Sequence, residues 1–277
     1  MSGMLVLCAT PIGNLADASP RLRDALESAD IVYCEDTRRS RKLITALGLQ
    51  VKLRSYFVAN EATRAVELAS HLEQGETVVL ISDAGTPAVA DPGLTAVRAA
   101  VEVGAKVTVV PGPSAVTAAI ALSGLPSERF VFEGFLPRKR EQRQAHLAEL
   151  AGEPRTMVFF VAASRAANEL AALSEALGGD RPAVLARELT KLHEEVWRGT
   201  LSEAAAHYRA NPPKGELTVV VGGTPVAAGD LEAAIAAVVR LEADGVLFSE
   251  AVKRTADAHA VRRRLLYEAA RRRLDSA

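Results

Sequence analysis

The segment from residue 78 to residue 93, VVLISDAGTPAVADPG, constrains the fold of this chain more than any other. Its first four residues are apolar and bounded by turn formers, which predicts a buried strand. A small polar loop punctuated by Gly85, Pro87 and Pro92 follows, and a helix is expected from about Leu94. In open α/β sheets, ligands bind beyond the carboxyl ends of the strands. The segment therefore predicts a ligand-binding loop, with an ordinary strand-to-helix turn as the alternative.

Short β-rich runs alternate with Ala- and Leu-rich helical segments through the first part of the chain. Strands are expected at residues 4–9, 31–34, 78–82 and 107–110, and helices near residues 20–29, 64–74, 94–103 and 114–122. This alternation predicts a mainly parallel sheet covered by helices on both faces. We expect a first α/β domain over residues 1–125 and a linker at residues 125–129.

The same pattern restarts in a second α/β domain, expected over residues 126–229. Strands are expected near residues 130–132, 157–161, 183–186, 195–198 and 217–221, and helices near residues 143–150, 166–177 and 201–209. Several connections are short, which favours antiparallel pairs. The pattern of residues 230–277 predicts a small C-terminal helical domain. We expect it to be a hairpin, with one helix capped by Ser249 and ending near residue 258, and a second over residues 262–274.

Composition excludes several classes of protein. Only 4% of the 277 residues are aromatic, which argues against a single-strand binder built on rows of stacked rings. No apolar run approaches the roughly 20 residues that span a bilayer, and the N-terminus lacks a signal-peptide pattern. Cys8 and Cys34 fall in expected strands and are interpreted as reduced core thiols rather than a disulfide or a metal pair. We therefore expect a cytoplasmic protein.

The net charge of −1 conceals a strong asymmetry. Between Lys253 and Arg273, eight Lys and Arg residues stand against two acids, a formal charge of +6. A second cluster at residues 138–143 adds +3, so the remainder carries about −10. Segregated basic residues suggest a polyanionic partner, with solvated helix ends as the alternative. The candidate RNA contacts are Arg138, Lys139, Arg140, Arg262, Arg263 and Arg264.

Two further loops follow strands of the first domain. Residues 10–15, TPIGNL, do not match G-x-G-x-x-G, so neither a Rossmann dinucleotide site nor a Walker-type phosphate site is supported. In residues 111–115, PGPSA, Ser114 is expected to cap the next helix, whose N-terminus is suited to a carboxylate. The loops are poor in lysine, which favours a zwitterionic or cationic ligand over a triphosphate. The five histidines lack metal-ligand spacing, and a hydrolase G-x-S-x-G elbow is absent.

In the second domain, residues 185–191, LARELTK, leave a strand with three charged residues and no helix signal. A surface turn is one interpretation of this segment. The other is that Arg187, Glu188 and Lys191 face a cleft between the two domains.

Six motifs occur in one order along the chain: TPIGNL at residues 10–15, EDTR at 35–38, SDAGTP with DPG at 82–93, PGPS at 111–114, EGFLP at 133–137 and ARELTK at 186–191. Each motif is weak alone, but the ordered set is specific. Together they resemble the ribosomal RNA small subunit methyltransferases of the tetrapyrrole methylase superfamily, over about residues 4–223. The basic helical tail is similar to the C-terminal domain of that family.

The resemblance implies two α/β domains of the tetrapyrrole methylase type with a cofactor cleft between them. It implies an enzyme that uses S-adenosyl-L-methionine to methylate the 2'-oxygen of a cytidine ribose in 16S rRNA, at the decoding centre of the small ribosomal subunit. It also implies a homodimer. By position, the resemblance assigns the cofactor to Pro11, Asp83, Ala84, Gly85, Val89, Ser114, Ala115, Phe160 and Leu189.

Methyl transfer is expected as an in-line displacement in which the ribose 2'-oxygen attacks the sulfonium methyl group. The leaving group is neutral, so the reaction requires no metal. Because the hydroxyl is a weak acid, a base or a cation should help as its proton leaves. Glu188 is the candidate proton acceptor, and Lys191 or Arg187 the candidate cation beside the alkoxide or a flanking phosphate. Asp83 is an alternative base, or an anchor for the amino group of the cofactor.

One segment departs from the pattern of the family. Where the family has Tyr-Glu-x-x-His-Arg, this chain reads FVAASR at residues 160–165, and only Arg165 is retained. Two alternative functions stay open. A tetrapyrrole (precorrin) methyltransferase shares the fold and cofactor, but typically carries a G-x-G-P-G-D loop where this chain has residues 10–15. A non-catalytic rRNA-binding factor on a methylase scaffold is compatible with the altered segment.

Overall fold

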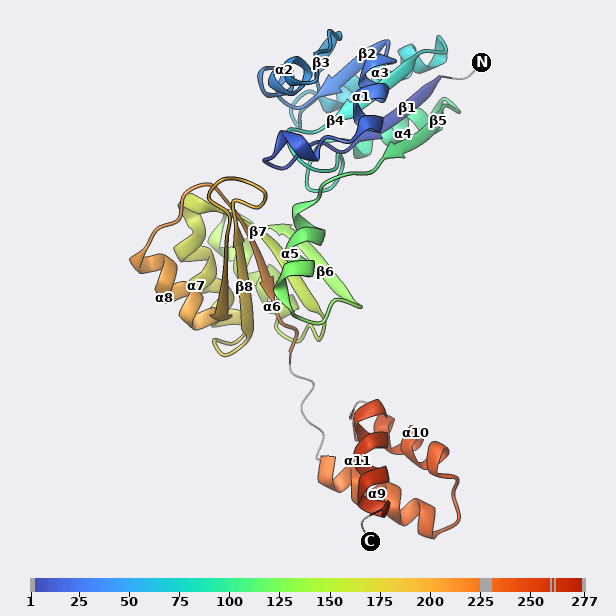
Figure 1. Cartoon of the computed structure of the whole chain (residues 1–277), viewed down its shortest axis with the longest axis vertical. Coiled ribbons are helices and arrows are strands. Elements are labelled where there is room, and N and C mark those ends of the chain that lie inside the picture. Colours follow the sequence, from blue (N-terminus) through green and yellow to red (C-terminus); the bar gives the residue numbers. More distant parts are fainter. Residues whose placement is uncertain (1–2, 225–230, 260, 262, 276–277) are drawn as a thin grey trace.

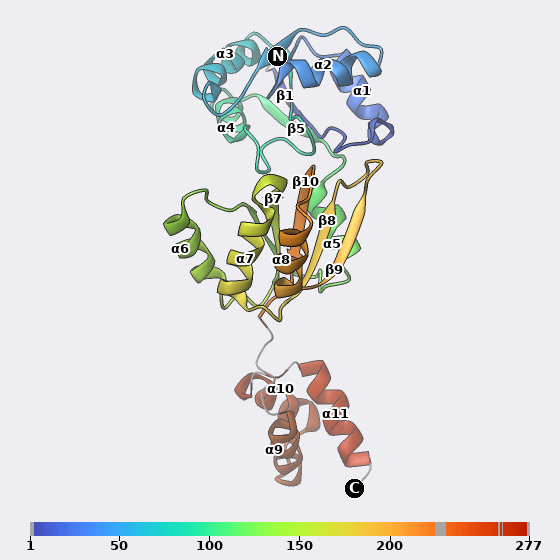
Figure 2. The same ribbon diagram turned by 90° about the vertical axis from the view of Figure 1, so that its left-hand side faces the viewer.

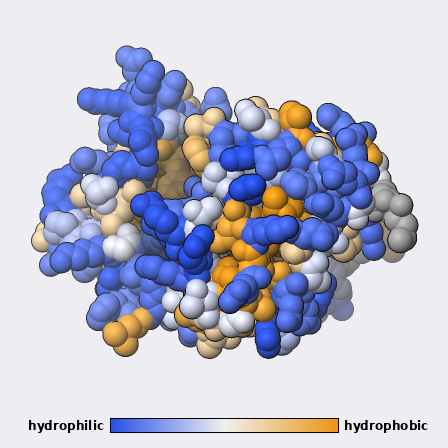
Figure 3. All heavy atoms as spheres, turned by 90° about the horizontal axis from the view of Figure 1, so that it is seen from above, coloured by the Kyte–Doolittle hydropathy of each residue, from blue (hydrophilic) through white to orange (hydrophobic). Residues whose placement is uncertain are grey.

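The computed structural model describes residues 3–224, 231–259, 261 and 263–275. Two five-stranded sheets follow each other along the chain, and a cluster of C-terminal helices stands apart from both (Figure 1). This arrangement confirms the α/β fold class with a helical C-terminal part. None of the helices in the described residues is long and apolar enough to cross a membrane. Seen from above the first sheet, the surface is mostly hydrophilic, with an apolar patch near its middle and smaller apolar spots elsewhere (Figure 3).

The first sheet is entirely parallel, which confirms the mainly parallel sheet that the alternating pattern predicts. Its strand order is β3-β2-β4-β1-β5. Its strands are β1 (Met4–Cys8), β2 (Ile31–Cys34), β3 (Leu53–Ser55), β4 (Thr77–Ile81) and β5 (Lys106–Val110). Helices α1 (Pro20–Glu27) and α2 (Thr37–Ala46) pack on one face, and α3 (Glu61–Glu73) and α4 (Leu94–Glu102) on the other. Cys8 and Cys34 are buried, free thiols on these strands, as expected.

The second sheet is mixed, in the order β6-β7-β10-β8-β9. Its strands are β6 (Phe130–Phe135), β7 (Thr156–Ala162), β8 (Pro182–Arg187), β9 (Glu195–Thr200) and β10 (Glu216–Val221). Only β6 and β7 pair in parallel, which confirms the antiparallel pairs expected from short connections. Helices α6 (Arg140–Leu150), α7 (Ala166–Leu177) and α8 (Leu201–Ala210) cover one face of this sheet.

Helix α5 (Ala115–Ser123) covers the opposite face of the second sheet, although it follows directly on the last strand of the first (Figure 2). Its Val116 and Ile120 belong to the same apolar cluster as Val158 and Val184. The Arg198 guanidinium donates a hydrogen bond of 2.6 Å to a carbonyl at the end of α5. The chain therefore passes from one sheet to the other at residues 111–114, and the expected linker at residues 125–129 lies between α5 and β6.

The described C-terminal residues form α9 (Leu231–Ala243), α10 (Phe248–Ala258) and α11 (Arg263–Asp275), so the expected two-helix hairpin is wrong. The three helices share a core of their own, in which Val238 and Leu266 are fully buried. The predicted Ser249 cap is also wrong, because α10 begins one residue earlier. The Phe248 ring packs on Tyr267 with ring centroids 5.0 Å apart, which ties the start of α10 to α11.

Candidate functional site

A cavity of about 560 Å³ lies between the carboxyl ends of the first-sheet strands and the second sheet. This volume falls within the roughly 300–1,000 Å³ of small-molecule sites in proteins. The 82–91 loop, the start of α5, the end of β7 and the start of β10 all contribute to its walls. The segment that the sequence singled out therefore faces a cavity, at the place where parallel sheets bind ligands.

The structure brings most of the predicted cofactor residues together around this cavity. The residues that line it are Asp83, Ala84, Gly85, Val89, Ser114, Ala115, Phe160 and Leu189. Pro11 is not part of the lining, but the next residue, Ile12, is. The residues come from both sheets, so no short segment of sequence could have shown their proximity.

The 82–93 loop is held in a strained shape. Ala88 and Ala90 have φ angles of +67° and +60°, in the left-handed region that side chains other than glycine rarely adopt. A two-way backbone bridge joins Gly85 to Thr10, with N···O distances of 2.9 and 3.1 Å. The Ser82 hydroxyl donates to the Gly85 carbonyl oxygen at 3.1 Å. Such strain persists only where surrounding contacts impose it, and it clusters at functional sites.

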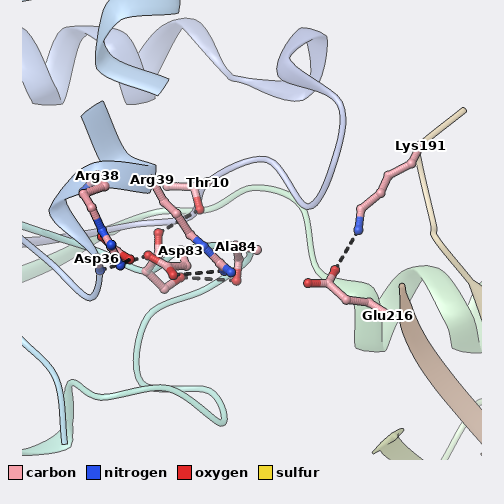
Figure 4. A network of polar contacts seen from close by, with 9 residues as sticks. Thr10, Asp36, Arg38, Arg39, Asp83, Ala84, Lys191 and Glu216 are labelled. Carbon is pink, nitrogen blue, oxygen red and sulfur yellow. Dashed lines mark hydrogen bonds and ion pairs between the residues drawn. The ribbon is translucent and has the colours of Figure 1, made fainter. Parts of the chain in front are cut away.

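Carboxylates outnumber cations in the cavity wall. The acidic residues of the wall are Glu35, Asp83, Asp91 and Glu216, and its basic residue is Arg39. The Arg39 guanidinium lies 3.2 Å from one Asp83 carboxylate oxygen, and the Asp36 backbone N–H donates to the other at 3.0 Å (Figure 4). A wall with this charge balance favours a cationic ligand over an anionic one.

Burial raises the pKa of two of these carboxyl groups. The pKa of Asp91 rises to about 6, mainly through burial and secondarily through the nearby charge of Glu35. The pKa of Glu35 rises for the same reasons, with Asp83 as its charged neighbour. The cavity therefore holds negative charge that a bound cation would stabilise. Across the described residues, no group of three or more His, Cys, Asp or Glu is arranged to hold a metal ion.

Lys191 crosses from the second unit toward the first. Its ammonium Nζ lies 2.9 Å from the Glu216 carboxylate (Figure 4). It also lies 2.8 Å from the Glu188 carboxylate. Its aliphatic stem lies against Gly13, where any larger residue would overlap it. Glu216 belongs to the cavity wall, so the ion pairs join the 187–191 loop to the cavity.

Glu188 is held in place more firmly than a surface turn would require. It adopts a φ of +50°, and its carboxylate accepts the Glu216 backbone N–H at 2.9 Å. The Lys191 hydrogen bond and this backbone bond lower the pKa of Glu188. A lowered pKa makes Glu188 a weaker proton acceptor, so the geometry favours it as the group that positions Lys191.

Arg187 does not join this pair. Its Nε donates to the Glu195 carboxylate at 2.8 Å, and its Nη1 donates to the Lys214 carbonyl at 3.4 Å. The hydrogen bonds of Arg187 thus go to other partners than those of Glu188 and Lys191, although all three lie within five residues of sequence.

Two further sequence expectations change in detail. Ser114 occupies the N-cap position of α5, but its side chain makes no capping hydrogen bond, so that expectation is wrong. Its side chain lies on the cavity wall instead. Arg165, the residue retained from the family pattern, pairs at 3.0 Å with Glu169, which is buried at 1% exposure. The retained arginine therefore stabilises the start of α7.

The predicted RNA-contact residues are exposed where the structure describes them. Arg138, Lys139 and Arg140 lie at the start of α6, just beyond β6. Arg263 and Arg264 are exposed on α11, and Arg262 lies outside the described residues. Arg264 pairs with Glu268 at 3.0 Å, and across residues 231–275 nine basic residues stand against seven acidic ones. The C-terminal helices are thus less basic than the 253–273 segment alone suggests.

Helix α2 is a basic surface that the sequence reasoning missed. It carries Arg38, Arg39, Arg41 and Lys42, all exposed, and no acidic residue. Arg39 reaches the cavity wall, so α2 begins at the edge of the cavity. Four basic residues within five positions were a readable signal.

Asp91→Asn should show how much the ionised carboxylate in the cavity wall lowers the free energy of unfolding. The folded state binds the Asp91 proton more tightly than the unfolded chain does, so the protonated carboxyl stabilises the fold at pH values below the pKa of the unfolded chain. This stability is lost as the pH rises through the folded-state pKa of about 6. The unfolding free energy of the variant, relative to the unsubstituted protein, should rise by about 2–3 kcal/mol between pH 4 and pH 7.5. Urea titrations across this range measure it. Asp24→Asn on the exposed side of α1 is the matched control, and a pH-independent difference for Asp91→Asn would contradict the raised pKa.

Known proteins match this chain along most of its length. The family model of the tetrapyrrole (corrin/porphyrin) methylases matches residues 4–205. The ribosomal RNA small subunit methyltransferase I of Mycobacterium tuberculosis H37Rv is 50% identical over 271 residues, covering 97% of this chain and 94% of that protein. The protein of the same name from Thermotoga maritima is 42% identical over 221 residues, covering 80% of this chain and 99% of that protein.

Solved structures share the fold at low sequence identity. The methyltransferase CobJ superimposes with a TM-score of 0.60 at 22% identity, over 81% of this chain and 95% of that one. Uroporphyrin-III C-methyltransferase from Thermus thermophilus, solved with S-adenosylhomocysteine, gives a TM-score of 0.54 at 20% identity, over 79% of this chain and 96% of that one. The fold, the family model and the half-identical relatives agree: the chain belongs to the tetrapyrrole methylase family, and within it to the ribosomal RNA small subunit methyltransferase I group.

Proposed function

We propose that this chain transfers a methyl group from S-adenosyl-L-methionine to the 2'-oxygen of a cytidine ribose in 16S rRNA, at the decoding centre of the small ribosomal subunit. The observation that carries the proposal is the cavity between the two sheets, in a chain half identical to rRNA small subunit methyltransferases. The precorrin alternative rests on the broad family model and on a shared fold, because the solved tetrapyrrole enzymes are under 25% identical, whereas the half-identical relatives are rRNA methyltransferases.

The residues present fit this cofactor. S-adenosyl-L-methionine carries a sulfonium and an ammonium, and the wall provides Asp83, Asp91 and Glu35 for positive charge. Its carboxylate suits the N-terminus of α5, because Ser114 and Ala115 line the cavity there and helix N-termini favour anions. When bound, the cofactor supplies the electrophilic methyl group. Closing the site around both reactants supplies orientation, which can contribute about 7–11 kcal/mol to lowering the barrier.

Lys191 is the cation that we assign to the developing alkoxide or to a flanking phosphate. Glu188 and Glu216 hold its ammonium at 2.8 and 2.9 Å, so its direction is fixed before substrate arrives. This fixed placement is how enzymes stabilise charge that forms in a transition state. Glu188 then acts as a positioning residue. Asp91, with its pKa near 6, is better matched than Glu188 to accept a proton at neutral pH.

Two basic surfaces and the C-terminal helices support an RNA substrate. Arg138, Lys139 and Arg140 follow a strand that ends at the cavity, and α2 begins at its edge. The helices from residue 231 onward carry exposed arginines, among them Arg263 and Arg264, on a nearly charge-balanced unit. The Thermotoga maritima match leaves about a fifth of this chain without a counterpart, a share similar to these C-terminal helices. We therefore assign them an accessory role in holding RNA, separate from the methyl transfer itself.

The proposal extends to domain limits, location and oligomeric state. We propose domains at residues 1–125, 126–229 and 230–277, a cytoplasmic location and a homodimer. Large apolar side chains on the first unit, such as Val66 at 73% and Val101 at 63% exposure, provide surface for a second copy. Light scattering of the purified protein tests the dimer, and cell fractionation tests the location.

The purified protein should transfer labelled methyl from S-adenosyl-L-methionine to small subunits that lack the modification. Alkali-resistant linkages in the recovered 16S rRNA then map the modified ribose, because a 2'-O-methyl group blocks cleavage at that position. Free 16S rRNA and assembled subunits, tested in parallel, identify the form of the substrate. Calorimetry with the cofactor separates a methyltransferase from a non-catalytic scaffold, and the absence of both binding and transfer would contradict the proposal.

Lys191→Met should lower turnover about 100-fold, the scale of losing one charge-stabilising group, with cofactor affinity unchanged. Cofactor affinity should hold because Lys191 is not part of the cavity lining. Glu188→Gln should have a smaller effect in the same direction, because the amide still accepts hydrogen bonds. Lys106→Met, at the opposite end of the first sheet, is the matched control. Wild-type turnover in both Lys191→Ala and Glu188→Ala would remove this loop from the mechanism.

A chain ending at Gly229 should bind rRNA more weakly and with a flatter salt dependence. Each lost phosphate contact lowers the slope of log K against log salt by about 0.7–0.9. Because the C-terminal helices are nearly balanced in charge, we expect the slope to fall by about 1–2. Filter binding between 50 and 300 mM salt measures the slope. An rRNA affinity equal to that of the full chain would contradict the role of these helices.

A further inference from the structure

A bulge in β6 sets the direction of one aromatic side chain at the cavity. The parallel register with β7 pairs Phe132 with Val158 and then Gly134 with Phe159, so Glu133 is one extra residue. Gly134 has a φ of +64°, which accommodates the irregularity. Bulges of this kind redirect side chains and are common beside active sites.

The bulge changes which face of the sheet Phe135 occupies. Side chains alternate along a strand, so residues three positions apart normally point to opposite faces. Here Phe132 and Phe135 both contact Phe160, with ring centroids 4.9 and 5.4 Å away. The extra residue, Glu133, approaches His146 on α6, which covers the opposite face, at 3.2 Å. The bulge therefore presents Phe135 to the cavity face and Glu133 to the helical face.

Phe135 is exposed as well as lining the cavity. Its side chain remains 54% accessible, whereas Phe159 in the adjacent strand is fully buried. The Phe160 ring contacts it at an interplanar angle of 56° with centroids 5.4 Å apart, and this contact leaves more than half of Phe135 accessible at the rim. An exposed, supported ring beside a cavity is typical of a binding surface rather than of a packing core.

The surroundings of the ring indicate an RNA base. Arg138, Lys139 and Arg140 begin three residues after Phe135, and all three are exposed. Aromatic rings that stack an unpaired base, next to cations that contact phosphates, are the usual means of binding single-stranded RNA. A ribose hydroxyl can enter a cavity only if its nucleotide leaves the helical stack, which exposes the base for such stacking.

We propose that the Phe135 ring is the platform on which the base of the target nucleotide stacks while its ribose enters the cavity. This inference rests on the proposed function and assigns a specificity-determining residue to it. Arg138, Lys139 and Arg140 hold the phosphates next to that nucleotide. The bulge at Glu133 is the device that turns the ring toward the substrate.

Steady-state kinetics of Phe135→Ala tests the assignment. The KM for the small-subunit substrate should rise about 5- to 150-fold, the range expected for losing one base–aromatic stack, while the Kd for S-adenosyl-L-methionine changes less than about 2-fold. Phe135→Tyr should restore the KM because it keeps the ring. Phe135→Leu should not, because it keeps apolar contact without a π face. Phe130→Ala, at the far end of the same strand and also partly exposed, is the matched control.

Two results would overturn the stacking role. One is a KM for the RNA substrate in Phe135→Ala equal to that of the unsubstituted protein. The other is a cofactor Kd that weakens by the same factor as the RNA KM, which would assign the ring to the cofactor. If the unsubstituted protein neither binds the cofactor nor methylates the subunit, the proposed function itself fails. The two failures are therefore distinguishable.

Discussion

The site depends on one apolar cluster that joins the two sheets. Ile12, from the loop after β1, packs in the same cluster as Val116 of α5 and Val184 of the second sheet. The first unit thus inserts a side chain into the core of the second, next to the point where the chain crosses over. Burial of these groups provides a non-directional attraction, and the Thr10–Gly85 bridge and the Lys191 ion pairs add direction. The cavity is the space that these contacts leave open.

Negative charge lines the cavity, whereas positive charge lies on the outer surfaces beside it. The wall of the cavity gathers carboxylates, two of which have raised pKa values because they are buried close together. The outer surfaces next to it gather cations, on α2 and at the start of α6. A cationic small molecule inside and a polyanion outside are therefore attracted to adjacent places by opposite fields. This separation explains how a chain with a net charge of −1 suits a nucleic-acid substrate.

The sequence predicted what periodicity and turn residues encode. The parallel first sheet, the antiparallel pairs of the second and the loop after β4 follow from apolar runs and from Gly and Pro positions. Strand β3 was missed because it has three residues and little burial, and α9 because only two helices were assigned to the region expected to be helical from residue 230. The domain limits at residues 125 and 229 stay predictions, and the second falls outside the described residues.

The candidate site was predictable only in part. Motif order brought forward the 82–93 loop, the 187–191 loop and Glu35 in EDTR. That Glu35, Arg39 and Glu216 meet in one cavity wall depends on the packing of the two sheets, which no local pattern encodes. The left-handed conformations of Ala88 and Glu188 were likewise invisible, because φ above zero is read from glycine and asparagine. The bulge that turns Phe135 depends on the register with β7, a property of two strands together.

The helices from residue 231 onward share a core to which no described residue of either sheet contributes. Two parts of a protein unfold cooperatively only if the unfolding of one removes stabilising contacts from the other. The described residues of the C-terminal core share no such contacts with the α/β part. The C-terminal helices and the α/β part can therefore unfold at different temperatures or urea concentrations. A single melting temperature would average two thermodynamic units, and calorimetric and van't Hoff enthalpies for the whole chain need not agree.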